Sequence, residues 1–452
     1  MTSQDPPQAV SFAQALAYWF KLGFISFGGP AGQIAMMHGE LVERRRWISE
    51  QRFLHALNYC MLLPGPEATQ LAVYIGWLMH RTAGGILAGA LFILPSLAIL
   101  ILLSWIYLAY GTLPAVAAVL YGIKPAVVAI VLAAAWRLGS RSLRNVWLIA
   151  IAVAALLAIA VLRVPFPAIV LGAALLGVLG GRLLPNKFHP GGAHGAAAAA
   201  SYGPAIIDDN TPTPAHARFS WQRLALMLAI GIGLGLAVWT ALALLYGHSS
   251  PLAQMGWFFT KAALLTFGGA YAVLPYVYQG GVQTYQWLSA AQMIDGLALG
   301  ETTPGPLIMI VAFVGFVGGW TKMLFGPDHL LLAGTIAACV VAFFTFLPSF
   351  IFILAGGPLV ESTRGNIRLT APLTAISAAV VGVVVSLALF FAWHVFRLEA
   401  PPERWDWVAI AITTVAAIAL LRYKAGTIKL ILACAAAGLV VSYLRQALEI
   451  PH

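Results

Sequence analysis

The sequence predicts an all-α polytopic membrane protein with about 13 transmembrane helices, built as two inverted homologous repeats with interrupted helices. Two observations predict this fold class, an apolar composition and an internal duplication. Of the 452 residues, 61% are hydrophobic and only 9% are charged, and the mean hydropathy is +0.89. Soluble domains carry roughly 25% charged residues, so this chain has too few polar side chains to cover a surface in water.

Each predicted span is a stretch of about 20 or more apolar residues, the length that crosses a bilayer. The spans of the first half are 12–37, 53–79, 84–110, 113–137, 146–163 and 165–184. Those of the second half are 222–247, 254–280, 291–319, 329–357, 371–396, 405–422 and 425–445. Between the halves, Ala, Gly, Pro and polar residues predict a flexible linker. The chain therefore divides into a first repeat at 1–184, a linker at 185–221 and a second repeat at 222–452 with one extra helix.

The duplication is read from four anchors that recur at a constant offset of 240 residues, from Lys21–Pro66 to Lys261–Pro306. In the first copy they are Lys21, Phe27-Gly28-Gly29, Trp47-x-Ser49 and Pro64-Gly65-Pro66, and in the second Lys261, Phe267-Gly268-Gly269, Trp287-x-Ser289 and Pro304-Gly305-Pro306. A later pair, Leu94-Pro95-Ser96 and Leu347-Pro348-Ser349, is offset by 253. Seven predicted crossings separate the copies. Because seven is odd, the copies have opposite orientations, an architecture common in secondary transporters.

The net charge of +10 is explained by basic residues in cytoplasmic loops, so no nucleic-acid partner is predicted. With a cytoplasmic N-terminus, thirteen Lys and Arg lie in inside loops and nine in outside loops. The main exception is the cluster Arg44, Arg45 and Arg46. Either this loop lies outside to attract anions, or one of the segments beside it is re-entrant. Cys60, Cys339 and Cys434 form no CxxC pair, so neither a disulfide framework nor a metal site is predicted, and no cofactor is expected.

Pro-Gly-Pro within an apolar span cannot continue a helix, because proline lacks an N–H group and clashes with the carbonyl four residues earlier. The two breaks are expected to free the carbonyls of Cys60, Leu62, Gly300 and Thr302. Unwound backbone at membrane depth is tolerated only inside protein or beside a water-filled cavity. The half-helices that begin at Pro66 and Pro306 would present N–H groups to an anion. A substrate site is therefore favoured over simple packing, although packing alone could explain any single glycine.

Ionisable residues inside spans are functional candidates. Lys21 and Lys261 occupy equivalent positions, and two half-helix N-termini supply only about half a charge each to a dianion. The two lysines are therefore predicted to supply the missing positive charge, with snorkelling to the interface as the alternative. Lys124 has no counterpart and would snorkel or pack, and Asp295 lies near a span end.

Polar residues also surround the two breaks. Glu67 and Glu301 could exchange a proton as the anion moves, or could cap a half-helix or neutralise a lysine. Thr302 and Thr303 offer hydroxyl donors beside the second break. Asn58 and Gln70 flank the first.

Five stretches carry a family resemblance: FGGPAGQIAMM, the turn RRRWIS, LPGPEATQLAVYIGW, FGGAYAVLPYV and GETTPGPLIMIVAFVGFVGG. They resemble the chromate transporter family in its long form with two fused halves. The resemblance implies an exporter in the inner (cytoplasmic) membrane that confers chromate resistance, driven by the membrane potential or a proton gradient. It implies opposite topologies for the halves and a chromate dianion that mimics sulfate.

Two other functions stay open, a carrier of sulfate or a related oxyanion and a membrane-embedded enzyme acting on a lipid phosphate. The chain has no P-loop, so ATP coupling is not expected. Protons and a second copy of the chain are further candidate partners. The predicted substrate-binding residues are Lys21, Phe27, Gly28, Gly29, Pro64, Gly65, Pro66, Glu67, Lys261, Phe267, Gly268, Gly269, Glu301, Thr302, Thr303, Pro304, Gly305 and Pro306, with Arg44, Arg45 and Arg46 in an anion-attracting loop.

Overall fold

The computed structural model describes residues 9–27, 29–188, 202–267, 269–362, 370–398 and 404–447. These residues form helices, apart from an antiparallel pair of two-residue strands, β1 (Arg397–Leu398) and β2 (Arg404–Trp405). Seven helices in the described part of the chain are long and apolar enough to cross a membrane. Three shorter apolar helices lie at 146–160, 307–321 and 407–421. The prediction of an all-α, multi-pass membrane protein is confirmed at this level.

The elements of the two halves follow similar orders. The first half contains α1 (Phe12–Ile25), α2 (Gly29–His38), the π-helix η1 (Gly39–Arg44), α3 (Glu50–Leu62), α4 (Glu67–Tyr110), α5 (Pro114–Ser142), α6 (Val146–Ala160), α7 (Phe166–Leu183) and α8 (Pro185–Phe188). After η2 (Ala215–Ala217) and α9 (Trp221–Tyr246) come α10 (Pro251–Leu264), η3 (Ala270–Val273), α11 (Leu274–Tyr278), the π-helix η4 (Gln279–Thr284), α12 (Ala290–Thr302), η5 (Leu307–Met309), α13 (Ile310–Thr321), η6 (Pro327–His329), α14 (Leu330–Ser362), α15 (Thr370–Phe396), α16 (Trp407–Leu421) and α17 (Thr427–Ala447).

Four of the predicted spans, 12–37, 53–79, 254–280 and 291–319, each contain two helices that fold back on each other. In the first half, Glu361 of α14 lies 3.6 Å from Arg52 near the start of α3 and accepts a 2.6 Å hydrogen bond from Tyr74 of α4. One acidic group can reach both residues only because α3 and the beginning of α4 run antiparallel. In the second half, a side chain at Gly296 of α12 would collide with Phe313 of α13. We call the four resulting bends tips 1 to 4, at residues 26–29, 63–66, 266–269 and 303–306.

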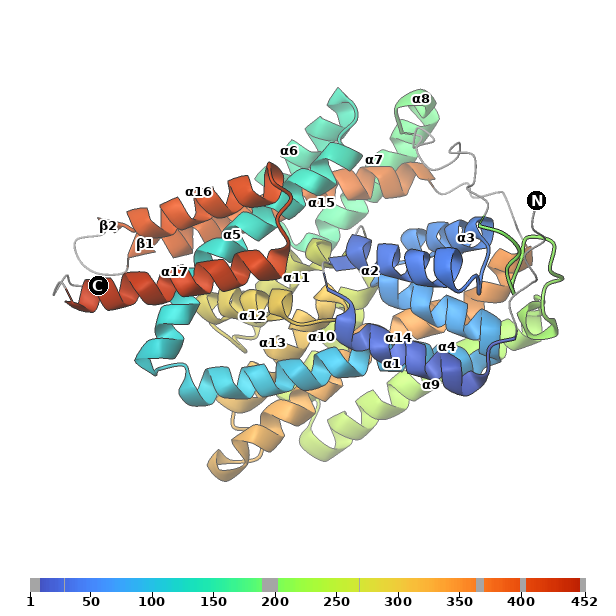
Figure 1. The fold of residues 1–452 in the computed structure, drawn as a ribbon, viewed down its shortest axis with the longest axis horizontal. Coiled ribbons are helices and arrows are strands. Elements are labelled where there is room, and N and C mark those ends of the chain that lie inside the picture. The colour runs from blue at the N-terminus through green and yellow to red at the C-terminus, as the bar shows by residue number, and fades with distance from the viewer. Residues whose placement is uncertain are drawn as a thin grey trace.

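Aromatic contacts hold the other two hairpins closed. Tyr18 of α1 packs edge-on against Trp47, which follows η1, with ring centroids 5.4 Å apart. Phe258 of α10 stacks on Tyr276 of α11 with centroids 4.7 Å apart. In Figure 1, α1 and α2 lie on either side of α4, which packs against both of them.

The helix α4 is divided by a sharp turn. His80 and Arg81 have non-helical backbone angles, with a φ of +58° at Arg81. The parts on either side pack closely, since a side chain on Gly84 would collide with the carbonyl of Gly76. Glycine lets two helix backbones approach in this way. Residues 67–79 are therefore the second arm of a hairpin, and the rest of α4 is a separate long helix.

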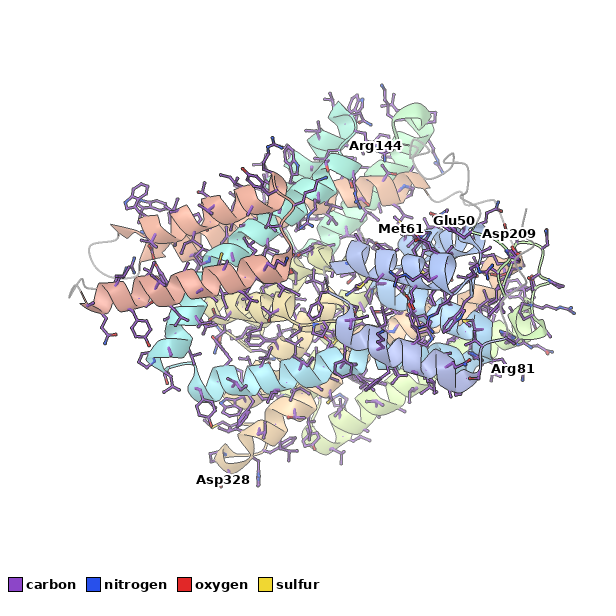
Figure 2. The ribbon with its side chains drawn as sticks, in the orientation of Figure 1. Glu50, Met61, Arg81, Arg144, Asp209 and Asp328 are labelled. Carbon is purple, nitrogen blue, oxygen red and sulfur yellow. The ribbon has the colours of Figure 1, made fainter. Side chains whose placement is uncertain are left out.

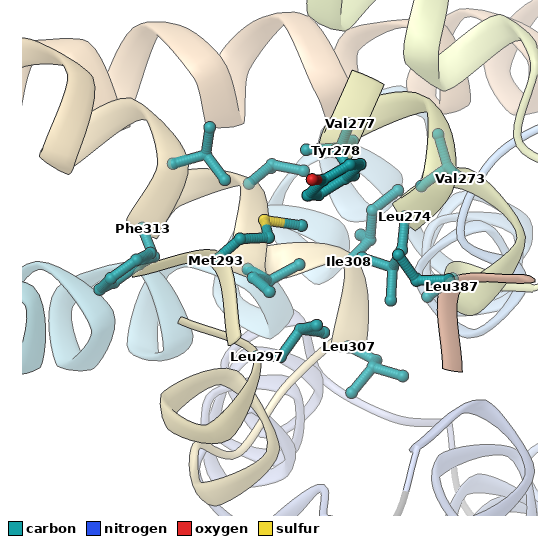
Figure 3. Close-up of a cluster of buried hydrophobic side chains, with 14 of the residues drawn as sticks. Val273, Leu274, Val277, Tyr278, Met293, Leu297, Leu307, Ile308, Phe313 and Leu387 are labelled. Carbon is teal, nitrogen blue, oxygen red and sulfur yellow. The ribbon is translucent and has the colours of Figure 1, made fainter. Parts of the chain in front are cut away.

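The long helices of the two halves interlock. The helix α5 packs against α16 and α17, while α15 packs against α6 and α7 (Figure 1). Glycines make both contacts close: Gly122 of α5 lies against Gly438 of α17, and Gly382 of α15 against Ala152 of α6. Apolar side chains then fix the second-half hairpins around tips 3 and 4 (Figure 3). Those labelled there are Val273, Leu274, Val277, Tyr278, Met293, Leu297, Leu307, Ile308, Phe313 and Leu387.

The second part of the predicted linker lies against the first half. Ile207 forms a parallel bridge with Ile48, and Asp209 accepts a hydrogen bond from the Ser49 hydroxyl. Asp209 and Glu50 line a cavity of about 250 Å³ at this end of the molecule (Figure 2). Residues 189–201 lie outside the described residues, so for them the flexible linker stays a prediction.

Candidate functional site

The four tips meet through two equivalent backbone hydrogen bonds. The N–H group of Gly65 in tip 2 donates to the carbonyl of Thr266 in tip 3, at 2.8 Å. The N–H group of Gly305 in tip 4 donates to the carbonyl of Ser26 in tip 1, also at 2.8 Å. Each Pro-Gly-Pro tip is thus bonded to the Phe-Gly-Gly tip of the other half. The breaks seen in the sequence therefore form one junction between the halves.

The local sequence explains the shape of tips 2 and 4. Prolines on both sides stop the helices, and Gly65 and Gly305 have φ angles of +122° and +100°, which side-chain-bearing residues rarely adopt. Two of the carbonyls expected to be free instead accept hydrogen bonds within a tighter turn, from the residue three positions later. Cys60 accepts from the N–H of Leu63, and Gly300 accepts from the N–H and hydroxyl of Thr303.

The serines of the two Leu-Pro-Ser motifs, Ser96 and Ser349, lie next to Gly305 and Gly65 respectively. A side chain at Gly305 would come within 2.6 Å of Ser96 Cβ, and one at Gly65 would collide with the hydroxyl of Ser349. Each serine belongs to the half that does not carry the glycine it touches. The serines went unnoticed as site residues in the sequence, although their recurrence at the offset of 253 is the signal that could have identified them.

Thr302 and Thr303 are less available than predicted. The Thr302 hydroxyl donates to the carbonyl of Leu299 at 2.7 Å, and that of Thr303 donates to Gly300 at 2.9 Å. In this conformation both donors are engaged by the end of their own helix.

Glu67 and Glu301 lie at tips 2 and 4. Glu67 is the first residue of α4, and Glu301 accepts a hydrogen bond from the hydroxyl of Tyr271. The charge of Glu67 interacts with that of Arg141, and the charge of Glu301 with that of Arg137. These arginines lie one helical turn apart on exposed positions of α5. From the sequence, Arg137 and Arg141 are counted among the thirteen basic residues of the inside loops. Their spacing of four residues at the end of a span was the signal that could have identified them as site residues.

Lys21 and Lys261 lie on outward faces. Lys21 is exposed beside Phe20 and Phe24, which are 52% and 45% exposed. The Lys261 ammonium lies 5.7 Å from the ring centroid of Trp257, which is 54% exposed. A long basic side chain among exposed apolar ones fits snorkelling. Their predicted role in binding substrate stays a prediction.

The remaining predicted residues of tips 1 and 3 are partly described. Phe27 and Phe267 are half-buried, and Gly29 and Gly269 have φ angles of +71° and +99°. Gly28 and Gly268 lie outside the described residues.

The arginine loop is partly neutralised by its own neighbours. Arg44 and Arg45 contact Glu40 at 3.3 and 2.8 Å. The hydrogen bond from Arg45 lowers the pKa of the Glu40 carboxyl below its ordinary value. The guanidinium of Arg45 also lies over the rings of Tyr18 and Trp47. The role of this loop in attracting anions stays a prediction.

Lys124 has a partner that its sequence context did not suggest. Its ammonium lies 3.4 Å from Asp295, which is buried in α12 and also accepts a 2.8 Å hydrogen bond from Tyr107. The pair joins α5, α12 and the long part of α4.

We expect Lys124→Ala to destabilise the protein by about 3 kcal/mol, because it leaves a buried carboxylate without its cation. This is the low end of the usual range, since the lysine side chain is one-third exposed. The variant Lys124→Ala/Asp295→Ala should recover at least half of the loss. Thermal unfolding in detergent measures both, with exposed Lys322→Ala as the control. A double variant less stable than either single one would contradict the pairing.

The fold and the junction together define a class, a multi-pass membrane protein with unwound backbone buried between its two halves. The chain belongs to the chromate transporter family, whose model matches residues 13–178 and 253–439. It is similar to the chromate transport protein of Pseudomonas aeruginosa, with 32% identity over 97% of this chain and 95% of the relative. It is also similar to that of Cupriavidus metallidurans, with 30% identity over 87% and 88%. No solved structure matches the chain. The protein is a transporter and not an enzyme, so the lipid-phosphate alternative is discarded.

Proposed function

We propose that this protein exports chromate across the cytoplasmic membrane as a secondary transporter, driven by the membrane potential or a proton gradient. The observation that carries the proposal is the reciprocal pair of hydrogen bonds, Gly65 to Thr266 and Gly305 to Ser26. It places the broken helices of both halves at one junction, and broken helices at a repeat interface are where secondary transporters bind ions. Chromate is favoured over sulfate because the two full-length relatives above are named for chromate transport.

We further propose that the two halves are inverted repeats and that the four hairpins are re-entrant. Nine helices then cross the membrane: the long part of α4, then α5, α6, α7, α9, α14, α15, α16 and α17. Five of them separate the two sets of hairpins, and because five is also odd, the halves still have opposite orientations. The two halves are therefore still expected to be inverted when four of the predicted spans are re-entrant hairpins.

The distribution of basic residues supports this topology. With the N-terminus inside, seventeen Lys and Arg fall in inside loops and only five outside. Those outside are Arg163, Lys322, Arg397, Arg404 and Arg445. The cluster Arg44, Arg45 and Arg46 moves to the inside, which removes the exception to the positive-inside rule.

Reporter tags test the topology. A tag in the loop at Trp47 should report the cytoplasmic side, and one in the loop at Trp287 the opposite side. A tag after Arg81 should share the side of the Trp47 tag, because both ends of a re-entrant hairpin lie on one side. Opposite reports at Trp47 and Arg81 would mean that residues 53–79 span the membrane, and equal reports at Trp47 and Trp287 would refute the inversion.

The proposed anion site uses the helix N-termini after tips 2 and 4, which begin at Glu67 and Leu307. Two N-termini offer about one unit of positive charge together, one short of the charge of a dianion. Arg137 and Arg141 are placed to add charge from the cytoplasmic end of α5, where export begins. Export of a dianion from a negative interior gains roughly 2.3 kcal/mol per charge per 100 mV.

Flux in proteoliposomes tests the proposal. We expect chromate flux that follows an imposed membrane potential, with competition by sulfate weaker than competition by unlabelled chromate. If the protein transports sulfate faster than chromate at equal concentration, the result would favour the alternative function as a sulfate carrier. No flux of either anion under a potential or pH gradient would refute the proposed function.

A further inference from the structure

Three residues at the junction of tips 1 and 4 carry buried oxygen atoms without hydrogen-bond partners. Among the described residues, the hydroxyls of Ser26 and Ser96 and the amide oxygen of Gln33 are buried and lack hydrogen-bond partners. All three residues surround Gly305. Gly305 donates to the Ser26 carbonyl, accepts from the Gln33 amide and lies against Ser96. Buried polar atoms are rarely left unsatisfied, so a bound water molecule or ion is expected at these three groups.

The orientation of Gln33 is set by its neighbours. Its amide nitrogen donates to the carbonyl of Gly305 and to that of Ser26, at 3.3 Å for the latter. Both partners are acceptors only, so the side chain cannot be turned over without facing oxygen with oxygen. The amide oxygen that remains can only accept. Gln70 at tip 2 is fixed in the same way, with its nitrogen donating to the carbonyl of Pro64 and its oxygen left without a partner.

The oxygen atoms without partners therefore decide whether the site binds an anion or a cation. Each tip joins a helix C-terminus to a helix N-terminus, so the helix ends do not select a charge by themselves. An anion would face the free oxygen of Gln33, whereas a cation would be coordinated by it and by two serine hydroxyls. The ligands are neutral oxygens, and divalent ions of the hard class prefer carboxylates while transition metals prefer nitrogen and sulfur. Neutral oxygens beside an unwound tip are typical of a sodium site.

The second half lacks the equivalent set. Val273 stands at the position of Gln33, and the hydroxyl of Thr266, the counterpart of Ser26, donates to the carbonyl of Ala262 at 2.7 Å. The counterpart of Ser96, Ser349, accepts from Gln70 at 3.4 Å. Gln70 at tip 2 also keeps one free oxygen, but among the described residues the set of two serine hydroxyls and one amide oxygen occurs at the junction of tips 1 and 4. This set lies beside the backbone hydrogen bond from Gly305 to Ser26.

We propose that Ser26, Gln33 and Ser96, with the carbonyl of Gly305, bind one sodium ion that holds tips 1 and 4 together. The site itself does not depend on which anion the protein moves. Its consequence for transport rests on the proposed function, because an occupied site stabilises the junction where the anion is expected to bind.

Binding of radioactive sodium to the purified full-length protein, with no chromate present, is the direct test. We expect saturable binding of about one ion, which potassium and protons do not displace. Gln33→Leu and Ser96→Ala should each weaken it by about tenfold or more, the loss of one oxygen ligand worth roughly 1.4 kcal/mol. Ser104→Ala is the matched control, because it removes a buried hydroxyl of the same helix that already donates to Leu100.

Several results would overturn the inference. Absence of saturable sodium binding would mean that water satisfies the three oxygens. An equal loss in Ser104→Ala and Ser96→Ala, or displacement by potassium or protons, would assign the binding elsewhere or to another cation. Chromate flux measured in parallel separates the two hypotheses. Flux without sodium binding refutes the site alone, and sodium binding without flux of any oxyanion refutes the proposed function alone.

Discussion

Substituting alanine for Gly65 or for Gly305 is expected to lower chromate flux by about 100-fold, equivalent to roughly 3 kcal/mol in an activation barrier. Both glycines have positive φ angles, and alanine at such an angle costs about 1–2 kcal/mol. The added methyl group would also collide with Ser349 or press against Ser96 in the opposite half. The tip must then shift, which breaks the hydrogen bond from its N–H group to the other half. Initial flux in vesicles at matched protein amounts measures the effect.

Gly247→Ala separates backbone strain from the loss of the junction. Gly247 has a φ of +92°, but nothing lies within 4 Å of the position where its side chain would be. It follows α9, away from the tips, so this variant should transport normally even if its stability falls slightly. Replacing all of Pro64-Gly65-Pro66 or Pro304-Gly305-Pro306 with alanine should also abolish transport, since the helix would close over the break. Normal flux in Gly65→Ala and Gly305→Ala would refute the role of the junction.

The breaks could be predicted from the sequence because their cause is local. Proline and glycine act on the backbone wherever they stand, so the two Pro-Gly-Pro triplets, Pro64-Gly65-Pro66 and Pro304-Gly305-Pro306, predicted unwound backbone at their own positions. The constant offset also predicted that the two breaks are equivalent. The helical composition followed from the length and apolar character of the segments.

The folding back of the hairpins could not be predicted, because hydropathy reports apolar length and not direction. Residues 53–79 are long enough for one span, and the same residues make two shorter antiparallel helices. The evidence for the second arrangement is tertiary: Arg52 and Tyr74 both contact Glu361, which is 287 positions from Tyr74 and still further from Arg52. The distribution of basic residues gave one indication of the hairpins. When every segment was treated as a span, the cluster Arg44 to Arg46 fell outside, against the positive-inside rule.

The sequence also could not predict which tips pair across the two halves. An internal repeat shows which residues are equivalent, but it does not show whether Gly65 bonds to Ser26 in its own half or to Thr266 in the other. Side-chain roles at the junction depend on that pairing. Gln33 and Ser96 drew no attention as single residues, because their free oxygens appear only once the neighbouring carbonyls are placed.

The last prediction concerns the source of positive charge for the anion. We expect Arg137→Ala/Arg141→Ala to lower chromate flux by about 100-fold at low concentration, mainly through a higher KM. Removing both guanidinium groups leaves a dianion facing Glu67 and Glu301 with only the helix N-termini to oppose its charge. Arg182→Ala, which removes an exposed charge from the end of α7, is the control and should have little effect.

The same assay decides between the arginines and the lysines. Lys21→Ala and Lys261→Ala should each change flux by less than about threefold, because in this conformation both lysines lie on outward faces of their helices, beside exposed apolar side chains. Flux of the arginine variant should fall less steeply with added salt than that of the wild type, since the screened attraction is already gone. If instead the arginine variant keeps the wild-type KM while both lysine variants are inactive, the lysines supply the charge, as the repeat alone first indicated. The hairpins would then have to rotate α1 and α10 during transport, because only such a rotation could turn Lys21 and Lys261 from the outward faces toward the junction.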